Sequence, residues 1–122
     1  YSIEGNVVHG ESRGHSLGFP TANIQSANEL LPAYGVYAVR ALLGGHHIDG
    51  VASIGVRPTF GEGPVSIEVF LFGYDGNLYG KHLEVAFIKR LRGEQKFPDV
   101  DALVGQMHKD VDQAKEILAV TK

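Results

Sequence analysis

The chain has 122 residues, of which 43% are hydrophobic and 20% are charged, so it is large enough for one domain, 1–122, with its own core. A net charge of −3 argues against a broad nucleic-acid-binding surface, and the lack of cysteine excludes disulfides and thiolate metal sites. No apolar run approaches the ~20 residues of a membrane-spanning helix, and no signal-peptide pattern is present. We therefore expect a cytoplasmic protein. Because it begins at Tyr1 without a methionine, we expect it to be a piece of a longer chain.

Short segments rich in β-branched and aromatic residues follow one another along most of the chain and predict a mainly β fold. The dipeptides Gly44-Gly45 and Asp75-Gly76 between them are typical of hairpin turns. With 16 glycines, this pattern favours a barrel or a sandwich. The predicted strands are 3–9, 34–43, 46–54, 66–74 and 82–91.

The last quarter of the chain changes from a strand pattern to a helical one. Apolar residues recur there along one helical face, which we expect to pack against the barrel. Asp99 is the expected N-cap, and Lys115 and Lys122 lie toward the C-terminal end, where positive charge is favourable. The apolar stripe consists of Val100, Leu103, Val104, Met107, Val111, Ala114, Ile117 and Leu118.

The stretch 14–23 contains two motifs with different chemical meanings. Gly14-His15-Ser16-Leu17-Gly18 has the spacing of a hydrolase nucleophile elbow, in which the serine lies on a sharp turn between a strand and a helix. Pro20 follows closely, and 21–26 show no helical apolar pattern. The sequence therefore disfavours a hydrolase with Ser16 as its nucleophile.

The same stretch has the chemistry of a site for nucleotide phosphates and magnesium. Its glycines permit sharp turns that bring backbone N–H groups close to phosphate oxygens, and Arg13 adds a forked cationic donor. Thr21 and Asn23 are oxygen ligands two residues apart, which an extended segment would direct toward one cation. Mg²⁺ takes few protein ligands beside phosphate and water. The alternative is an ordinary glycine-rich connection between strands.

Glu68 is a carboxylate within an otherwise apolar predicted strand. Both faces of 66–74 are largely apolar, so we expect the strand to be covered on both sides. Burial disfavours the charged form of a carboxylate, which suits a general base working near neutral pH. The alternative is a strand-end glutamate that reaches solvent or pairs with an arginine.

Several blocks, in this order, resemble the riboflavin kinase domain, especially the C-terminal module of bacterial bifunctional FAD synthetases. The most specific block is Arg13-Gly14-His15-Ser16-Leu17-Gly18-Phe19-Pro20-Thr21-Ala22-Asn23-Ile24, and the others are 5–10, 31–38, 50–60, 68–71, 78–81 and 91–97. The resemblance covers nearly the whole chain. It implies a six-stranded antiparallel closed β-barrel of the Greek-key type with a C-terminal helix. It also implies transfer of the ATP γ-phosphoryl group to the 5′-hydroxyl of riboflavin, which gives FMN and ADP.

The resemblance further implies roles for individual residues. Glu68 matches the catalytic glutamate, and Thr21 and Asn23 match the residues that bind the Mg²⁺ of Mg-ATP. The residues implied to bind ATP are Gly10, Arg13, Gly14, His15, Ser16, Gly18, Phe19, Pro20 and Leu78. The residues implied to lie near the flavin, in a loop that we expect to be mobile without ligands, are Arg92, Glu94 and Phe97.

Two expectations follow for the reaction and its partners. Many bacterial relatives carry an N-terminal adenylyltransferase domain, so we expect such a domain in the full-length protein and FMN, not FAD, as the product of this chain alone. We expect neither nucleic acid nor a membrane as a partner. The alternative function is a non-catalytic flavin or nucleotide sensor on the same barrel. The presence of Thr21, Asn23 and Glu68 together argues against it, since a sensor needs no base.

Overall fold

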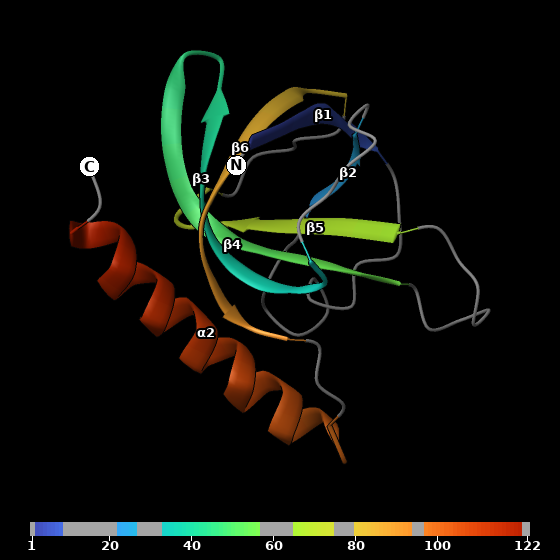
Figure 1. Cartoon of the computed structure of the whole chain (residues 1–122), viewed down its shortest axis with the longest axis vertical. Coiled ribbons are helices and arrows are strands. Elements are labelled where there is room, and N and C mark those ends of the chain that lie inside the picture. The colour runs from blue at the N-terminus through green and yellow to red at the C-terminus, as the bar shows by residue number, and fades with distance from the viewer. Residues whose placement is uncertain are drawn as a thin grey trace.

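The computed structural model describes residues 2–8, 22–26, 33–56, 65–74, 80–93 and 97–120. Within these ranges, antiparallel strands precede a single C-terminal helix (Figure 1), which confirms the predicted mainly β fold with a C-terminal helix. The elements are β1 (Ser2–Val8), β2 (Ala22–Ser26), β3 (Gly35–Leu43), β4 (His46–Val56), β5 (Val65–Leu71), β6 (His82–Arg92) and the helix α2 (Val100–Val120).

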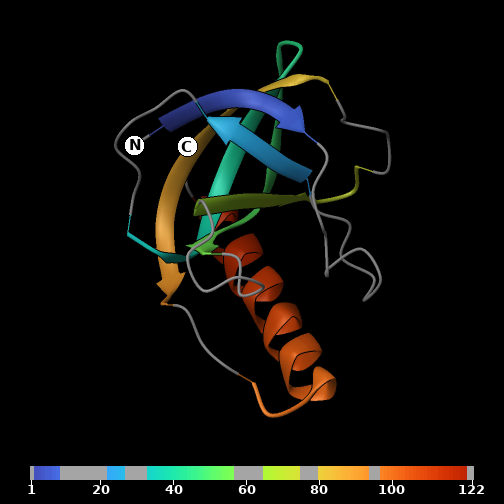
Figure 2. The same ribbon diagram turned by 90° about the vertical axis from the view of Figure 1, so that its right-hand side faces the viewer.

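The strands pair in the order β1-β2-β5-β4-β3-β6, and β6 also pairs with β1, so the ladder returns to its first strand and forms a closed barrel. Figure 2 shows the strands curling around the interior, with α2 on the outside. The β2–β5 ladder is the shortest one, with Ala22 opposite Val69 and Asn23 opposite Glu68. The apolar pattern did not predict β2, because Ile24 is the only large apolar residue of that strand.

The turn between β3 and β4 forms at Gly44-Gly45, as predicted. Their φ values of 56° and 85° are those that a two-residue hairpin turn of type I′ requires. The other predicted turn, Asp75-Gly76, lies outside the described residues. Each predicted strand end lies within two residues of the observed one, except that β5 ends at Leu71 and not at 74. Gly73, with φ of 70°, turns the chain directly after it.

Alternate residues of the strands fill the barrel interior. On β5, Ile67, Val69 and Leu71 are 3%, 1% and 3% exposed, and they belong to one apolar cluster to which every strand contributes. Tyr37 and Phe87 meet edge to face in this cluster, with ring centroids 5.1 Å apart. Burial of each large apolar side chain contributes about 1.5–3 kcal/mol, so the interior cluster is the main source of stability for the barrel.

The helix α2 packs against the outer surface of β3, β4 and β6 (Figure 1). Its N-cap is Asp99, as predicted, because the backbone N–H of Ala102 donates to Oδ1 of Asp99 at 2.7 Å. Ala114 and Leu118 are buried against Ala38 of β3 in a second apolar cluster. The apolar outer face of the barrel is thus covered by the helix.

The predicted apolar stripe of the helix is wrong at one residue and omits a buried one. Val100 is 53% exposed, because the N-terminal end of α2 extends past the strands (Figures 1 and 2). Asp110 is 3% exposed and so is buried beside the predicted apolar stripe, although it was not part of that stripe. In addition, the last turn of α2 contains no basic residue; Nζ of Lys115 instead lies 5.3 Å from the ring centroid of Phe72.

Candidate active site

Glu68 lies on β5 between two neighbouring strands. The register pairs it with Asn23 of β2 and with Ser53 of β4. Directly opposed positions of antiparallel strands share a face of the sheet, with Cα atoms about 4.5–5.5 Å apart. Since Ile67 and Val69 fill the interior, Glu68 is on the outer face, where it is half-buried. The expected cover on both sides of this strand is therefore only partial at Glu68.

The row that contains Glu68 continues across the barrel surface. Ser53 is opposite Val36 of β3, and Val36 is opposite Arg92 of β6. One cross-strand row thus links the predicted metal ligand Asn23, the predicted base Glu68 and the predicted flavin-binding residue Arg92. Neighbouring strands are about 4.8 Å apart, so Glu68 and Arg92 are separated by on the order of 15 Å along the curved surface.

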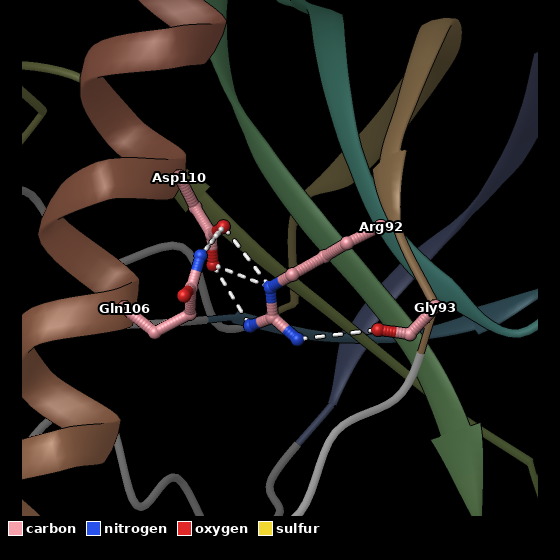
Figure 3. Close-up of polar contacts among 4 residues, drawn as sticks. All are labelled: Arg92, Gly93, Gln106 and Asp110. Carbon is pink, nitrogen blue, oxygen red and sulfur yellow. Dashed lines mark hydrogen bonds and ion pairs between the residues drawn. The ribbon is translucent and has the colours of Figure 1, made fainter.

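The side chain of Arg92 is held by Asp110 of α2 (Figure 3). Its Nε lies 3.0 Å from Oδ1 and 3.2 Å from Oδ2 of Asp110, and its Nη2 donates to Oδ2 at 2.8 Å. Gln106 donates from Nε2 to Oδ1 of Asp110 at 3.0 Å. The two paired side chains are 19% and 4% exposed. Such a forked, charge-assisted pair ties the end of β6 to the helix in a fixed geometry.

Phe97 lies beside the same guanidinium group. The Cζ atom of Arg92 is 5.6 Å from the centroid of the Phe97 ring, which is within range of a cation–π interaction. Two of the three predicted flavin-binding residues are therefore in contact with each other. The third, Glu94, lies outside the described residues.

Asp110 and Gln106 were not predicted as site residues. Asp110 comes three residues after Met107 and four before Ala114, which is the spacing of the core-facing stripe. A carboxylate at such a position needs a cationic partner, because burial of an unpaired charge is very costly. This spacing was the signal that Asp110 needs a cationic partner, and only the folded structure identifies that partner as Arg92.

Most of the predicted nucleotide-binding residues lie outside the described part of the chain. These are Thr21, Gly10, Arg13, Gly14, His15, Ser16, Gly18, Phe19, Pro20 and Leu78. Asn23 is described by its strand position.

β2 begins at Ala22, where the hydrolase interpretation of Ser16 requires a helix, so that interpretation is wrong. Within the described ranges, no three His, Asp or Glu residues come together to hold a metal ion.

Among the described residues, no helix combines the length and the apolar character needed to cross a membrane.

Comparison with known proteins identifies one family. The family model for riboflavin kinase, Flavokinase, matches residues 1–118. The bifunctional riboflavin kinase/FMN adenylyltransferase of Escherichia coli K12 is 42% identical over 123 residues, which cover 100% of this chain and 39% of that protein. The Haemophilus influenzae protein of the same name is 45% identical over 116 residues, covering 94% of this chain and 38% of that protein. The chain thus spans about two fifths of the length of these relatives.

Two solved structures have the same fold. The structure titled macrolide-efflux protein from Streptococcus pneumoniae has a TM-score of 0.84 and 33% identity, and the match covers 99% of this chain and 39% of that one. Riboflavin kinase from Trypanosoma brucei has a TM-score of 0.67 and 26% identity, with 98% and 77% covered. The first title names a different activity, and its likeness to this chain is one of fold and sequence. Because the family model matches almost from end to end and bacterial relatives exceed 40% identity, this chain belongs to the riboflavin kinase family, whose reaction is the phosphorylation of riboflavin to FMN.

Proposed function

We propose that this chain phosphorylates the 5′-hydroxyl of riboflavin with ATP as donor, and that Asn23 and Glu68 act together in this step. The observation that carries the proposal is their direct pairing between β2 and β5, in a chain that matches the family over 1–118. Phosphoryl transfer needs a metal-bound phosphate and a base close to the accepting hydroxyl. Asn23 and Glu68 lie on neighbouring strands, whose backbones are about 5 Å apart, so a metal ligand and a base at these positions can serve one site.

We infer that Thr21 and Asn23 hold the divalent ion of the ATP complex, and that this ion is Mg²⁺. Hydroxyl and amide oxygens are hard neutral ligands, which suit Mg²⁺ when phosphates and water complete its octahedron. The two residues are two positions apart, and Asn23 lies inside an observed strand. In an extended backbone, residues two positions apart point to the same side, which supports the proposal that both bind one ion. When bound, the ion neutralises charge on the β- and γ-phosphates.

In the proposed mechanism, Glu68 accepts the proton of the 5′-hydroxyl while the hydroxyl oxygen attacks the γ-phosphorus. The bond from that phosphorus to the β,γ-bridging oxygen breaks, and ADP leaves with its electrons. The backbone N–H groups of 10–18 and the Arg13 side chain stabilise charge on the phosphates. Glu68 is half-buried, so it can return its proton to solvent after FMN forms.

For the flavin, we propose contact with Arg92, Glu94 and Phe97. Phe97 offers an aromatic face, and Arg92 offers a planar cation next to it, 5.6 Å from the ring centroid. Both groups suit a flat ring system. The cross-strand row from Glu68 to Arg92 supports this arrangement, because riboflavin is elongated and must reach both the base and the ring-binding residues.

We also propose that this chain works beside an adenylyltransferase part in the full-length protein, in the cytoplasm. Support comes from the names of the bacterial relatives, which are bifunctional, and from the 39% of the Escherichia coli protein that this chain matches. The kinase part would then supply the FMN that the other part adenylylates.

A turnover assay with riboflavin, ATP and Mg²⁺ tests the proposed function, with the flavins separated by chromatography. We expect FMN and ADP in equal amounts and no FAD from this chain. A parallel preparation of Glu68→Gln controls for contaminating kinases, because a contaminant would give the same rate in both. Tight binding of riboflavin and ATP without FMN formation would instead favour the sensor alternative.

A further inference from the structure

Gly93 and Phe97, which flank residues 94–96, both contact the guanidinium group of Arg92. Nη1 of Arg92 donates to the carbonyl oxygen of Gly93 at 3.2 Å, and the Phe97 ring centroid lies 5.6 Å from Cζ. The other two nitrogens, Nε and Nη2, bind Asp110 (Figure 3). The plane of this one group therefore determines where the connection begins and where its aromatic ring lies.

That plane is set by the helix. Asp110 is 3% exposed, so water does not compete for its oxygens, and Gln106 holds Oδ1 from one helical turn away. Ala114 and Leu118, one and two turns further along α2, are buried against the barrel. The carboxylate is thus presented to Arg92 by a helix that is itself anchored. Without this carboxylate, Arg92 would keep only the Gly93 carbonyl and the Phe97 ring as partners, and its long side chain would have more rotamers available.

We propose that Asp110 and Gln106 are positioning residues for the flavin, which they orient through Arg92 and Phe97 without touching it. The inference rests on the proposed function, in which Arg92 and Phe97 contact riboflavin. It assigns α2 a role in substrate binding in addition to covering the barrel. The proposed role is a positioning role. A small displacement of Arg92 or Phe97 would change the orientation of the bound flavin, and such displacements have large effects on a reaction.

The substitution Asp110→Asn tests the proposal, because it keeps the shape of the side chain and removes the charge and one acceptor oxygen. The dissociation constant of riboflavin is measured by quenching of flavin fluorescence, with Mg-ADP present, and KM is measured for both substrates. We expect riboflavin binding to weaken by about tenfold, the effect of one charge-assisted hydrogen bond, with KM for ATP unchanged. Asp112→Asn makes the same chemical change on the exposed side of α2 and should leave riboflavin binding unchanged.

The variant Leu118→Ala distinguishes positioning of the flavin from a purely structural role. It loosens the packing of α2 and leaves both side chains of the ion pair in place. This variant should lower the melting temperature and weaken riboflavin binding much less than Asp110→Asn does, because the ion pair itself is kept. The proposal is overturned if Asp110→Asn binds riboflavin like the parent, or if Leu118→Ala weakens binding as much. If Asp110→Asn does not fold, Gln106→Met replaces it, with an expected weakening of about threefold for one hydrogen bond at the edge of the cluster. Failure of the proposed function would look different, because the parent itself would then bind riboflavin and form no FMN.

Discussion

Arg40 of β3 donates from Nη2 to the backbone carbonyl oxygen of Leu118, in the last turn of α2, at 3.2 Å. The same side chain donates from Nε to Oδ1 of Asp49 at 2.8 Å. The last turn of α2 contains no basic residue, and the last carbonyl groups of any helix lack partners within the helix. Arg40 therefore supplies from the barrel the positive charge that a helix C-terminus favours.

Replacement of Arg40 by Met should lower the free energy of unfolding by about 1–2 kcal/mol, because the carbonyl of Leu118 and the helix dipole lose their cation. Asp49→Asn removes only the ion pair with a carboxylate that is 38% exposed, and such pairs contribute about 0–1 kcal/mol. Urea denaturation of the two variants and the parent measures the difference. Equal losses for both variants would show that the contact with the helix end contributes nothing.

Removal of one partner of the Arg92–Asp110 ion pair should strongly lower the free energy of unfolding, whereas replacement of both partners by apolar residues should lower it much less. Asp110→Ala leaves the guanidinium group of Arg92 at a largely buried interface without its counter-ion, which should cost about 3–5 kcal/mol. The double variant Arg92→Leu with Asp110→Leu removes both charges and should recover most of that loss. Guanidinium chloride denaturation gives both values. A double variant no more stable than Asp110→Ala would contradict this account.

Glu68→Gln should reduce turnover by roughly 10²–10⁴-fold, the usual effect of losing a positioned base. The loose transition state of phosphoryl transfer favours the lower end of that range. Riboflavin and Mg-ATP should bind with nearly parental affinity, because the lost proton transfer matters chiefly in the transition state. Glu84→Gln, an exposed glutamate on β6, is the matched control. Near-parental turnover in a folded Glu68→Gln protein would falsify the assignment.

Asn23→Ala and Thr21→Ala should weaken ATP binding mainly when Mg²⁺ is present, because each removes an oxygen ligand of the ion. Isothermal titration with ATP, once with Mg²⁺ and once with a chelator, separates the metal-dependent part of the affinity. Asn6→Ala changes an exposed asparagine of β1 and serves as the control. If both variants bind Mg-ATP as tightly as the parent, these residues do not hold the metal.

Two glycines should respond to alanine in opposite directions. Gly105 is exposed in α2, and an added Cβ meets no atom within 4 Å. Gly105→Ala should therefore raise the free energy of unfolding by about 0.5–1 kcal/mol through the lower entropy of the unfolded chain. At Gly35, φ is 151° and a Cβ would collide with the carbonyl oxygen of Arg92, so Gly35→Ala should be destabilising. Thermal unfolding of both variants checks the two signs.

Local patterns identified the elements whose signals lie in neighbouring residues. The alternation of Ile67, Val69 and Leu71 predicted β5, Gly44-Gly45 predicted a hairpin, and Asp99 predicted the start of the helix; each is confirmed. The motif resemblance likewise identified the family, because the blocks that carry it are contiguous in the chain. The roles of individual site residues, including Glu68 and Asn23, stay predictions.

The tertiary structure alone decided which distant residues meet. β2 has one large apolar residue, so its place in the barrel depends on pairing with β1 and β5 and not on its own pattern. Only that register brings Asn23 opposite Glu68. The sequence analysis gave no role to Asp110, whose pairing with Arg92 exists only because α2 packs beside β6. Pairing register and ion pairing between separate elements depend on contacts across the barrel, which no local period in the sequence encodes.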